Sequence, residues 1–405
     1  MQRITIVGGG IVGLTSAVAL AQAGFAVSVF EPDAARNAAS WGNAGHIATE
    51  QLAPLASPAS LRSVPGRMFA RGGALDLPLN MIRHWLPFAL KMLRASTPGR
   101  FARGRAALTP LLADALPAWQ RLGAAVGAPE LIRTDGHFVL WESEASAQRG
   151  RAAWAAAETG TATFRDATMA ELDAIDALNT TPYLDGIRFA GSGQISDLGD
   201  LADALERALV TAGGRIVRET AGLIVKDGRA CVVGSESDLV LIAAGARSAA
   251  LMRAAGHQVP LIAERGYHIR AAAAAWPADM PPIVFEDRAM IVTRYRDQVQ
   301  AASFVEFGAV DAPPDDAKWR RLEEHVGALG LPLTGPFVRW IGARPTLPDY
   351  LPAIGRSRRA GNLLYAFGHQ HLGLTLAPIT AELVVALARD TAPAIDITPF
   401  DVERF

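Results

Sequence analysis

The stretch Arg3–Glu31, which reads RITIVGGGIVGLTSAVALAQAGFAVSVFE, decides the fold. It begins with a short apolar run that is typical of a buried strand, and three consecutive glycines follow at once. Small and apolar residues then continue over 11–23 and stop at Gly24, as in a helix that ends at a glycine. A second apolar run, over 26–30, closes with Glu31. We therefore predict strand, glycine turn, helix and strand in close succession, which is how a parallel α/β sheet begins.

The glycines of this turn have the spacing G-x-G-x-x-G, at positions 8, 10 and 13. Between a strand and a helix, this spacing lets the backbone approach a pyrophosphate at the helix N-terminus, where free N–H groups point outward. An acid at the end of the second strand can accept hydrogen bonds from an adenosine ribose, and Glu31 stands there. A glutamate in this place disfavours the 2′-phosphate of NADP. The predicted dinucleotide-binding residues of this unit are Gly8, Gly10, Ile11, Val12, Gly13 and Glu31.

Two later segments also run from a buried strand into a turn of small residues. Residues 238–244 (DLVLIAA) lead into the turn GARS at 245–248, and residues 362–367 (NLLYAF) lead into the turn GHQHLGLT at 368–375. A helix predicted over 377–388 follows the second turn, and its dipole could face the edge of a flavin that carries negative charge when reduced. The residues predicted to approach the cofactor here are Ala244, Gly245, Gly368, His369, His371, Leu372, Gly373, Leu374 and Thr375.

The region before residue 238 supports a flavin rather than a nicotinamide cofactor. We predict a helix over 200–212, a strand near 215–218 and a hairpin with its turn at 226–229. These elements would complete a nucleotide-binding sheet that carries an antiparallel insert. A simple NAD dehydrogenase does not usually arrange its second half in this way, so FAD is favoured.

The composition of the chain limits which other classes of protein remain possible. A chain of 405 residues exceeds the usual size of one core, so two domains are expected. The formal charge of −1, without a concentrated basic surface, argues against nucleic acid as a partner. One cysteine, Cys231, excludes disulfide frameworks and cysteine metal sites, and we expect it to be a buried strand residue. Lys226 and Lys318 stand in polar contexts typical of a surface, which argues against Schiff-base chemistry. No metal site is predicted.

The segments together resemble the D-amino-acid oxidase/dehydrogenase superfamily of FAD enzymes, which includes glycine and sarcosine oxidases. The resemblance rests on five stretches in order: GGGIVG at 8–13, SWGNAGH at 40–46, AAGARS at 243–248, GARPTLPD at 342–349 and GHQHLG at 368–373. The second and fourth look most like bacterial D-amino-acid dehydrogenases. The stretch GNAGHIATEQLAPLASP at 42–58 is also similar to dehydrogenases that act on D-hydroxyproline.

The resemblance implies an α/β fold in which a Rossmann-like FAD-binding domain of the two-dinucleotide-domain type is interleaved with an α+β substrate domain. The substrate domain would contain a mostly antiparallel sheet. Residues 1–60, 185–259 and 341–405 would form the FAD-binding domain, and residues 61–184 and 260–340 the substrate domain. The FAD is expected to be noncovalent, because no cysteine lies near the C-terminal turn, where some relatives attach the flavin.

The resemblance also assigns roles to residues. Arg344, in the G-x-R-P element, would bind the substrate carboxylate, since its planar fork matches a carboxylate; a structural salt bridge is the alternative. His46 would line the active site, and Tyr267 would approach the substrate unless it is a buried structural residue. Glu50 and Gln51 either shape the pocket or lie in a surface loop. Further residues near the flavin would be Ser40, Asn43, Ala44, Gly45, His46 and Gly342.

The reaction implied is oxidative deamination of a D-amino acid, including D-proline or hydroxyproline, by hydride transfer from Cα to flavin N5. The electron acceptor is open, and a quinone or another carrier would serve. The alternatives are an oxygen-using oxidase of the glycine or sarcosine type, a flavoprotein subunit of a larger complex without turnover of its own, and an NAD-dependent dehydrogenase.

Residues 79–93 (LNMIRHWLPFALKML) could place the enzyme at a membrane. Their apolar and basic residues would suit a helix that lies on a membrane surface. The favoured alternative is a helix packed inside the substrate domain, because apolar positions run nearly all round it. No secretory signal and no membrane-spanning helix are expected. The protein is therefore predicted to be cytoplasmic, either free or peripheral at the inner face of the membrane.

Overall fold

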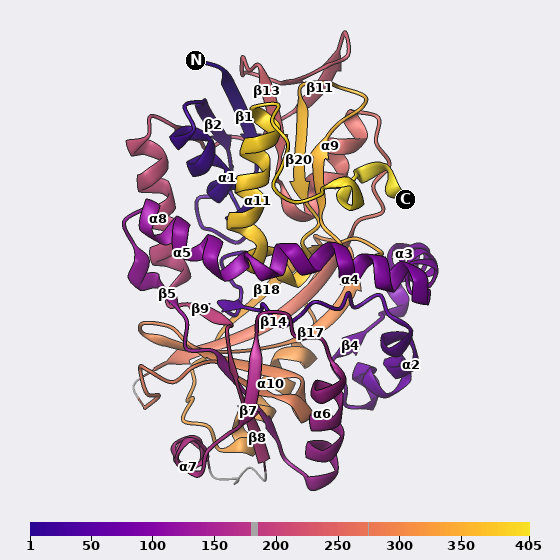
Figure 1. Ribbon diagram of the computed structural model, residues 1–405. Helices are drawn as coiled ribbons and strands as arrows, with labels where there is room; N and C mark the ends of the chain where they lie inside the picture. The colour runs from indigo at the N-terminus through magenta and orange to yellow at the C-terminus, as the bar shows by residue number, and fades with distance from the viewer. Residues whose placement is uncertain (180–184, 274) are drawn as a thin grey trace.

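A computed structural model describes residues 1–179, 185–273 and 275–405. The described chain forms two interleaved parts, each built on a large sheet (Figure 1). The sheet that contains β1 fills the upper half of this view, and the sheet that contains β14 and β17 fills the lower half. Both termini lie in the upper half, so the chain crosses between the parts and returns.

The first sheet has six strands in the order β10-β2-β1-β13-β20-β19. All its pairings are parallel except that of β19 with β20, as in a sheet built from βαβ crossovers. The edge strand β19 is joined to β20 as an antiparallel pair. The strands are β1 (Arg3–Val7), β2 (Ala26–Phe30), β10 (Arg215–Val217), β13 (Leu239–Ile242), β19 (Ala353–Arg356) and β20 (Leu363–Phe367).

Helix α1 (Ile11–Gln22) is buried on most sides, because the sheet covers one face and α11 and α8 pack against it. Small residues such as Ala17 let these helices come close, and Ala17 is fully buried. The antiparallel hairpin of β11 (Leu223–Lys226) and β12 (Arg229–Val232) projects beyond the sheet, as predicted from its turn.

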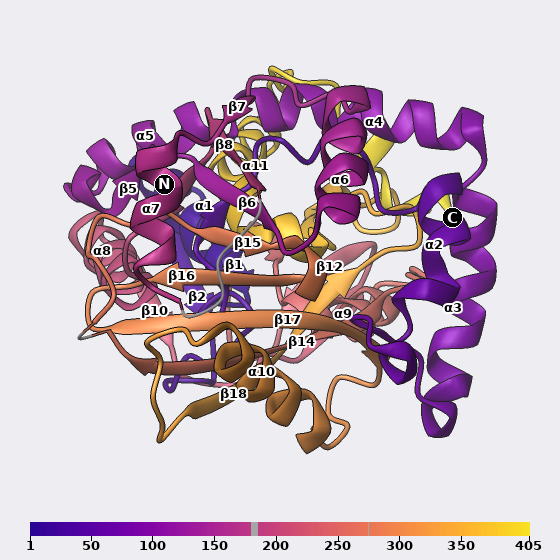
Figure 2. The same cartoon turned by 90° about the horizontal axis from the view of Figure 1, so that it is seen from below.

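The second sheet has nine strands in the order β18-β14-β17-β16-β15-β6-β8-β7, with β4 paired to β17. Only the pairings of β15 with β6 and of β17 with β4 are parallel, which confirms the mostly antiparallel sheet. Figure 2 shows its long strands side by side, with α10 beneath them. The strands are β4 (Leu75–Asp76), β6 (His137–Trp141), β7 (Thr163–Asp166), β8 (Asp185–Ala190), β14 (Ile262–Ala272), β15 (Ile283–Phe285), β16 (Met290–Arg294), β17 (Gln298–Gly308) and β18 (Val338–Thr346).

A small third sheet joins the two parts. Its strands are β3 (His46–Ile47), β9 (Gly193–Ile195) and β5 (Ile132–Arg133), in the order β3-β9-β5. Helices α4 and α5 cross the front of the molecule where the halves meet (Figure 1). The remaining helices are α2 (Pro58–Arg67), α3 (Ile82–Ala95), α4 (Pro98–Ala113), α5 (Ala115–Ala125), α6 (Glu144–Ala156), α7 (Met169–Asp176), α8 (Leu198–Thr211), α9 (Ser248–Ala254), α10 (Asp316–Leu329) and α11 (Gly373–Ala388).

Strand pairing shows where the chain passes from one sheet to the other. β8, which begins at Asp185, pairs with β6 and β7 of the second sheet, although residues from 185 onward were assigned to the FAD-binding part. β18 runs across residue 341 to Thr346 and pairs with β14 throughout. The chain therefore stays in the second sheet to the end of β8 and to the end of β18, because a strand keeps its ladder until the chain leaves the sheet. The predicted boundary at 184 falls outside the described residues.

Two burial predictions were wrong. Cys231 is exposed, because side chains alternate along β12 and the hairpin is covered on one face only. Lys318 is fully buried rather than on the surface. Its ammonium lies 2.7 Å from Asp76, 2.6 Å from Glu306 and 2.9 Å from Asp315. Burial alone would lower the pKa of Lys318, but the hydrogen bonds that its ammonium donates to these carboxylates raise the pKa overall, so the residue stays cationic and remains unsuited to Schiff-base chemistry.

Residues 79–93 are helical and carry apolar side chains on two faces, but the helix is not enclosed inside the substrate domain. Phe88 is buried against the second sheet, whereas Leu86 and Leu90 are exposed. A different helical stretch, Gln370–Ala388, is long and apolar enough to span a membrane, with a mean hydropathy of 1.6 over its most apolar window. Of this apolar stretch, 67% is buried inside the protein. Helix α11 packs there on α1, α4 and α5, as expected of a core helix.

Candidate active site

The turn between β1 and α1 is closed on one side and open on the other. A Cβ on Gly13 would lie 1.9 Å from the carbonyl oxygen of Gly8, so the helix can approach the strand only with glycine there. A Cβ on Gly10 would meet only the hydroxyl of Ser40, at 3.1 Å. Gly10 precedes the first turn of α1, whose N–H groups point to that side. The turn thus has the open face and free donors that a pyrophosphate requires.

Glu31 ends β2 beside this turn. Its Oε2 accepts a hydrogen bond from the backbone N–H of Gly9 at 2.7 Å, and its Oε1 accepts one from Asp33 at 3.0 Å. The carboxylate is therefore held at the carboxyl end of the sheet, next to the helix N-terminus. This is where the ribose of an adenosine lies when a βαβ unit binds a dinucleotide.

The second predicted turn lies against the first. A Cβ on Gly8 would lie 2.5 Å from the carbonyl oxygen of Ala243 and 2.7 Å from Cα of Ala244. β13 delivers these residues, because it pairs in parallel with β1 over its whole length. Gly245 follows with φ of +53° and begins a short 3-10 helix that packs beside β18.

The C-terminal turn reaches the same region from β20. Thr346 at the end of β18 forms an isolated β-bridge with His369, and the hydroxyl of Thr375 accepts a hydrogen bond from the backbone N–H of Ala48 at 3.0 Å. Helix α11 begins at Gly373, so its N-terminus points to where β3, β18 and β20 come together. The three glycine-bearing turns converge, and residues present at each fit an extended dinucleotide cofactor.

The loop 40–45 joins this cradle to the substrate sheet. Ser40 Oγ accepts a hydrogen bond from the N–H of Ile11 at 3.0 Å. On the other side, the hydroxyl of Tyr295 donates to the carbonyl oxygen of Asn43 at 2.6 Å, and His268 lies 3.0 Å from the carbonyl oxygen of Gly42. The loop is therefore fixed between the two sheets.

Several predicted cofactor-contacting residues have side chains in the core. Ile11, Leu372 and Leu374 are buried there, so only their backbone atoms are available to a ligand. Val12 packs against the core of the first sheet, Ala44 is partly exposed in the loop, and Gly45 has φ of +71°. Gly342 lies within β18, where a Cβ would lie 2.0 Å from the ring of Trp340.

Arg344 projects from β18 toward the neighbouring strand β14. Its Nη1 donates to Oε1 of Glu264 at 3.1 Å and to the carbonyl oxygen of Phe304 at 3.4 Å. The side chain of Glu264 is 1% exposed, whereas that of Arg344 is 28% exposed. Among the described residues both hydrogen bonds of Arg344 use Nη1, which leaves Nε and Nη2 for a ligand. Thr346 and Tyr350 donate to the other oxygen of Glu264, at 3.1 and 3.2 Å, and fix the pair.

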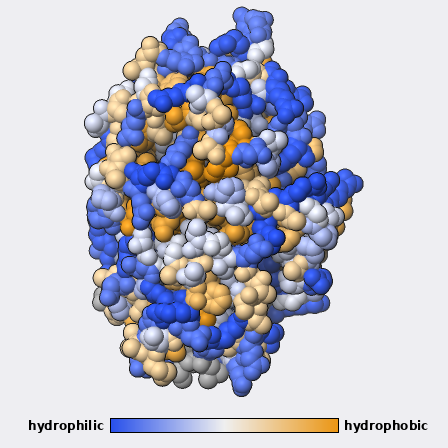
Figure 3. Space-filling model, viewed as in Figure 1, coloured by the Kyte–Doolittle hydropathy of each residue, from blue (hydrophilic) through white to orange (hydrophobic). Residues whose placement is uncertain are grey.

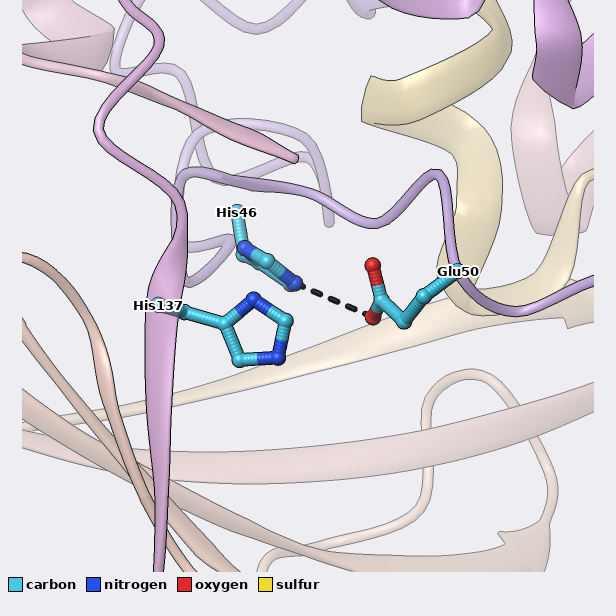
Figure 4. A group of neighbouring side chains, drawn as sticks. All are labelled: His46, Glu50 and His137. Atoms are coloured by element: carbon cyan, nitrogen blue, oxygen red, sulfur yellow. Dashed lines mark hydrogen bonds and ion pairs between the residues drawn. The ribbon is translucent and has the colours of Figure 1, made fainter. Parts of the chain in front are cut away.

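A second cluster of polar side chains lies where the loop 40–45 ends and consists of His46, Glu50 and His137. Nε2 of His46 lies 3.2 Å from Oε1 of Glu50, and the ring of His137 meets that of His46 edge-on (Figure 4). Both Nδ1 of His46 and Oε2 of Glu50 are buried and have no hydrogen-bond partner within the described chain. Burial would raise the pKa of Glu50, but the charges of His46 and His137 and the hydrogen bond to His46 lower it to about 2. Burial lowers the pKa of His137 to about 3.

Ligand-atom spacing alone would allow a metal ion at two places. His46, Glu50 and His137 offer atoms within 4.8 Å of one another, as do Asp76, Glu306 and Asp315. The ammonium of Lys318 already neutralises the second group. In the first group, Nδ1 of His137 is taken by Ser192 at 2.8 Å, and Glu50 is paired with His46. We therefore treat the first group as a cluster of polar side chains rather than as a metal centre.

His371 lies near both polar groups, because its ring contacts Gln51, the neighbour of Glu50 in sequence, and its turn, Gln370–Leu372, packs beside β18, which carries Arg344. Its Nε2 is 2.6 Å from Oε1 of Gln51. Burial lowers its pKa to about 4, and the charges of Glu264, Arg344 and Glu50 also act on it. The charges of Arg344 and Glu50 thus both act on one neutral imidazole, at the turn that precedes α11. His369 is turned away into the core, where its Nε2 lies 3.0 Å from the hydroxyl of Thr380, and burial lowers its pKa to about 3.

The structure does not place Tyr267 in the polar cluster of Arg344, Glu50 and His371. Its side chain is 1% exposed, its hydroxyl donates to Glu306 at 3.1 Å, and the same oxygen accepts from the N–H of Asp315. The ring packs edge-on against Trp319 in the core of the substrate sheet. The hydroxyl is therefore already used as donor and acceptor in the buried network around Lys318.

Sequence reasoning missed Glu264, His137 and Tyr350. Glu264 carried a signal, because it is a charged residue that directly follows the apolar residues at the start of β14. Such a residue requires a partner when buried. Its partner Arg344 was singled out, but nothing local indicated that the two strands would pair in this register.

These features define a class. A parallel sheet with a glycine turn at a helix N-terminus, an acid at the end of β2 and two further small-residue turns is the cofactor domain of a flavin-dependent oxidoreductase, here joined to a separate substrate sheet.

The whole chain places it in one family of that class. Residues 3–387 match the model of the DAO family, described as FAD dependent oxidoreductase. The chain belongs to this family and is an FAD-dependent oxidoreductase, so the NAD alternative was wrong.

Individual relatives agree with the family. The chain is 30% identical over 425 residues to a D-amino-acid oxidase of Bradyrhizobium diazoefficiens, with 100% of this chain and 99% of the relative covered. It is 26% identical to D-amino acid dehydrogenase 1 of Mesorhizobium japonicum, with the same coverage. Among solved structures, iminodiacetate oxidase from Chelativorans matches with a TM-score of 0.73 and 18% identity, covering 98% of both chains. Glycine oxidase from Geobacillus kaustophilus matches with a TM-score of 0.70 and 21% identity over the full length of both. These likenesses confirm the fold class.

Proposed function

We propose that the protein oxidises a D-amino acid by FAD-dependent deamination. One observation carries the proposal: a partly exposed guanidinium, Arg344, and a buried carboxylate, Glu50, both lie near His371 at the turn that precedes α11. Two opposite charges near the same turn match the carboxylate and the amino group of an α-amino acid. The relatives named D-amino-acid oxidase and D-amino acid dehydrogenase support the choice of substrate class.

The residues that would hold the cofactor are those of the three turns, with the Gly8–Gly13 turn and Glu31 at the adenosine end. Bound FAD supplies the acceptor for the hydride that leaves the substrate Cα. The flavin edge would then lie at the N-terminus of α11, where the helix dipole favours negative charge.

Arg344 would bind the substrate carboxylate. Nη1 is tied to Glu264, so the guanidinium has a fixed plane, and Nε and Nη2 remain as a pair of parallel donors. A bidentate guanidinium holds a carboxylate in one orientation, which also orients Cα. The same pair with Glu264 is the salt bridge considered as the alternative role, and the two roles are compatible.

Glu50 would hold the amino group by charge. With a pKa near 2 it stays ionised at neutral pH, so it is a weak base and acts mainly by attraction. His46 orients it through the contact between Nε2 and Oε1. The site has few exposed atoms: the side chains of His46 and Glu50 are 9% and 2% exposed. Exclusion of water disfavours an ammonium whereas the Glu50 carboxylate favours it, so the substrate would bind as the ammonium and lose that proton before hydride transfer, which requires the neutral amine.

The finer substrate assignment is D-proline or hydroxyproline, for which the product would be a cyclic imine. Its support is the stretch 42–58, which resembles D-hydroxyproline dehydrogenases. An acyclic D-amino acid would instead give an imine that hydrolyses to a 2-oxo acid.

An anaerobic screen of flavin bleaching tests the proposal. Purified holoprotein is mixed with single D- and L-amino acids, including both hydroxyproline epimers, and the loss of oxidised-flavin absorbance is followed. Rapid bleaching by D-amino acids supports the proposal. Bleaching by L-amino acids alone would overturn the stereochemistry, and no bleaching by any amino acid would favour a flavoprotein subunit without turnover.

The second candidate is an oxygen-using oxidase of the glycine or sarcosine type. The relative named D-amino-acid oxidase and the structural likeness to glycine oxidase favour it. Peroxide formation separates the candidates. A dehydrogenase reduces an artificial dye and makes little peroxide, whereas an oxidase makes one peroxide for each substrate oxidised.

The electron acceptor and the location belong to the same proposal. We infer a dehydrogenase that passes electrons to a quinone or another carrier, and that works in the cytoplasm at the inner face of the membrane. Reduction of a soluble quinone analogue by substrate-reduced holoprotein, faster than reduction of oxygen, would support it.

A further inference from the structure

Helix α3 presents an apolar stripe to solvent. The exposed fractions are 80% for Leu79, 42% for Ile82, 42% for Leu86, 55% for Leu90 and 50% for Leu93. The last four residues fall within roughly 80° of the helix circumference at 3.6 residues per turn. Leu79, in the 3-10 turn that precedes α3, continues the stripe. Large aliphatic side chains aligned in this way mark a contact surface.

The opposite face of α3 already anchors the helix. Phe88 and Ala95 are buried, and Trp85 and Met92 pack against the same cluster beneath the helix. The fold therefore does not need the stripe for its own core. In Figure 2, α3 runs along the outer edge of the molecule, beside α2.

The region around the stripe is strongly basic. Residues 51–113 contain nine Lys and Arg residues and a single acid, Asp76, which gives a net formal charge of +8. Asp76 is used by the buried Lys318, at 2.7 Å. Of the nine cations only Arg105 has an acidic partner among the described residues, Glu158 at 2.7 Å. The basic residues are Arg62, Arg67, Arg71, Arg83, Lys91, Arg94, Arg100, Arg103 and Arg105.

Three of these cations, Arg83, Lys91 and Arg94, are exposed on α3 itself. Arg83 and Arg94 lie next to the leucines at 3.6 residues per turn, and Lys91 lies further round on the same polar face. The hydropathy colouring shows blue and orange side chains together at the edge formed by α3 (Figure 3). An apolar strip with cations along one border is the pattern of a helix that lies in a membrane interface.

Charge decides between a membrane and a second copy of the chain. A symmetric dimer through this face would bring the same patch of each copy together, and therefore cation against cation. An anionic surface instead attracts the cations that lie on α3. We propose that α3 lies flat on a bilayer that contains anionic lipid, with Leu79, Ile82, Leu86, Leu90 and Leu93 in the acyl boundary and the cations at the phosphates. This inference is independent of the reaction, because none of these residues belongs to the flavin site.

Vesicle flotation of the holoprotein tests the inference. The vesicles contain phosphatidylcholine mixed with phosphatidylglycerol, or phosphatidylcholine alone. We expect binding to the anionic vesicles that weakens as salt is raised, because both the surface potential and the attraction are screened. Absence of binding to anionic vesicles would overturn the inference, and equal binding to neutral vesicles would overturn the role of the cations.

Two double variants test whether vesicle binding depends on α3. In Leu86→Gln/Leu90→Gln, binding should fall about tenfold or more, since binding strength scales with inserted apolar area. In Arg83→Gln/Lys91→Gln it should fall about 25-fold, or about fivefold for each cation removed. Val210→Gln on α8 and Arg149→Gln on α6 replace an exposed apolar residue and an exposed cation elsewhere, and should bind like the parent protein.

Two further measurements complete the test. Substrate oxidation with a soluble dye should be unchanged in both α3 variants, because they alter only the outer surface. Sedimentation measures the oligomeric state in parallel. A dimer of the parent protein that is lost in Leu86→Gln/Leu90→Gln, without vesicle binding, would show that a second copy covers the stripe.

Discussion

Arg344 donates a hydrogen bond to Glu264, which is buried and almost fully enclosed, across the β14–β18 pairing at 3.1 Å. The carboxylate is fixed by Thr346 and Tyr350, so the position of the guanidinium is set by groups that do not depend on a substrate. Arg344 is thus held in place before a ligand arrives, which reduces the ordering cost of carboxylate binding.

Arg344→Leu should retain FAD but lower kcat/KM for carboxylate substrates by about 100-fold or more, because a charged partner is removed. It also leaves Glu264 unpaired, so unfolding free energy should fall by about 3–5 kcal/mol. Arg344→Leu/Glu264→Gln should recover stability without recovering turnover. Arg339→Leu, at the exposed start of β18, is the control and should leave kcat/KM unchanged. Near-normal kinetics in Arg344→Leu would remove this residue from substrate binding.

Glu50→Gln should raise KM for amino acids by about tenfold or more, because the anion that faces the amino group is lost. FAD content should stay the same, since Glu50 belongs to the substrate side of the site. Steady-state kinetics and the flavin absorbance measure the two effects. Glu324→Gln replaces an exposed glutamate on α10 and serves as the matched control. An unchanged KM would show that Glu50 only supports the loop.

Gly10→Ala should fold but bind FAD about tenfold more weakly or worse, because its Cβ would fill the open side of the pyrophosphate turn. Gly99→Ala, at the start of α4 with nothing within 4 Å of the new Cβ, is the matched control. The ratio of flavin to protein absorbance and the FAD dissociation constant measure the effect. Equal affinity in the two variants would contradict the assignment of this turn.

Acid should destabilise the protein below pH 6.5 through its buried histidines. Burial lowers the pKa of His268 to about 3, with a further contribution from Arg270, so the unfolded chain binds a proton that the folded protein excludes. The stability present above pH 6.5 is therefore lost as pH falls toward 3. His268→Asn should reduce the slope of unfolding free energy against pH by up to about 1.4 kcal/mol per unit in this window.

Urea unfolding at several pH values between 7 and 4 measures that slope. The exposed His84 provides the control: the slope of unfolding free energy against pH should be the same in His84→Asn as in the parent protein. A slope unchanged by His268→Asn would mean that another buried group carries the proton linkage.

Local patterns predicted the cofactor sheet well. β1 and β2 have the predicted bounds, because a glycine turn between two short apolar runs has few other solutions. The hairpin turn at 226–229 was also confirmed, since its geometry is set by adjacent residues. The long antiparallel sheet was inferred from family resemblance, because its strands pair residues far apart in the chain.

The substrate side was less predictable because its contacts are non-local. Glu264 meets Arg344 only in the register that β14 and β18 adopt, and β14 carries an irregularity between Arg265 and Tyr267 in its pairing with β17. That irregularity helps to decide which side chains face the site. Lys318 looked like a surface residue, because Asp76 and Glu306 come from other strands.

The exposed thiol of Cys231 gives this chain a practical handle. It is the single cysteine of the sequence, and it lies on a hairpin that projects beyond the cofactor sheet. A maleimide dye can therefore be attached to one defined position without any substitution. A labelled holoprotein would report rotational tumbling by fluorescence anisotropy while the flavin and the outer face of α3 keep their native side chains.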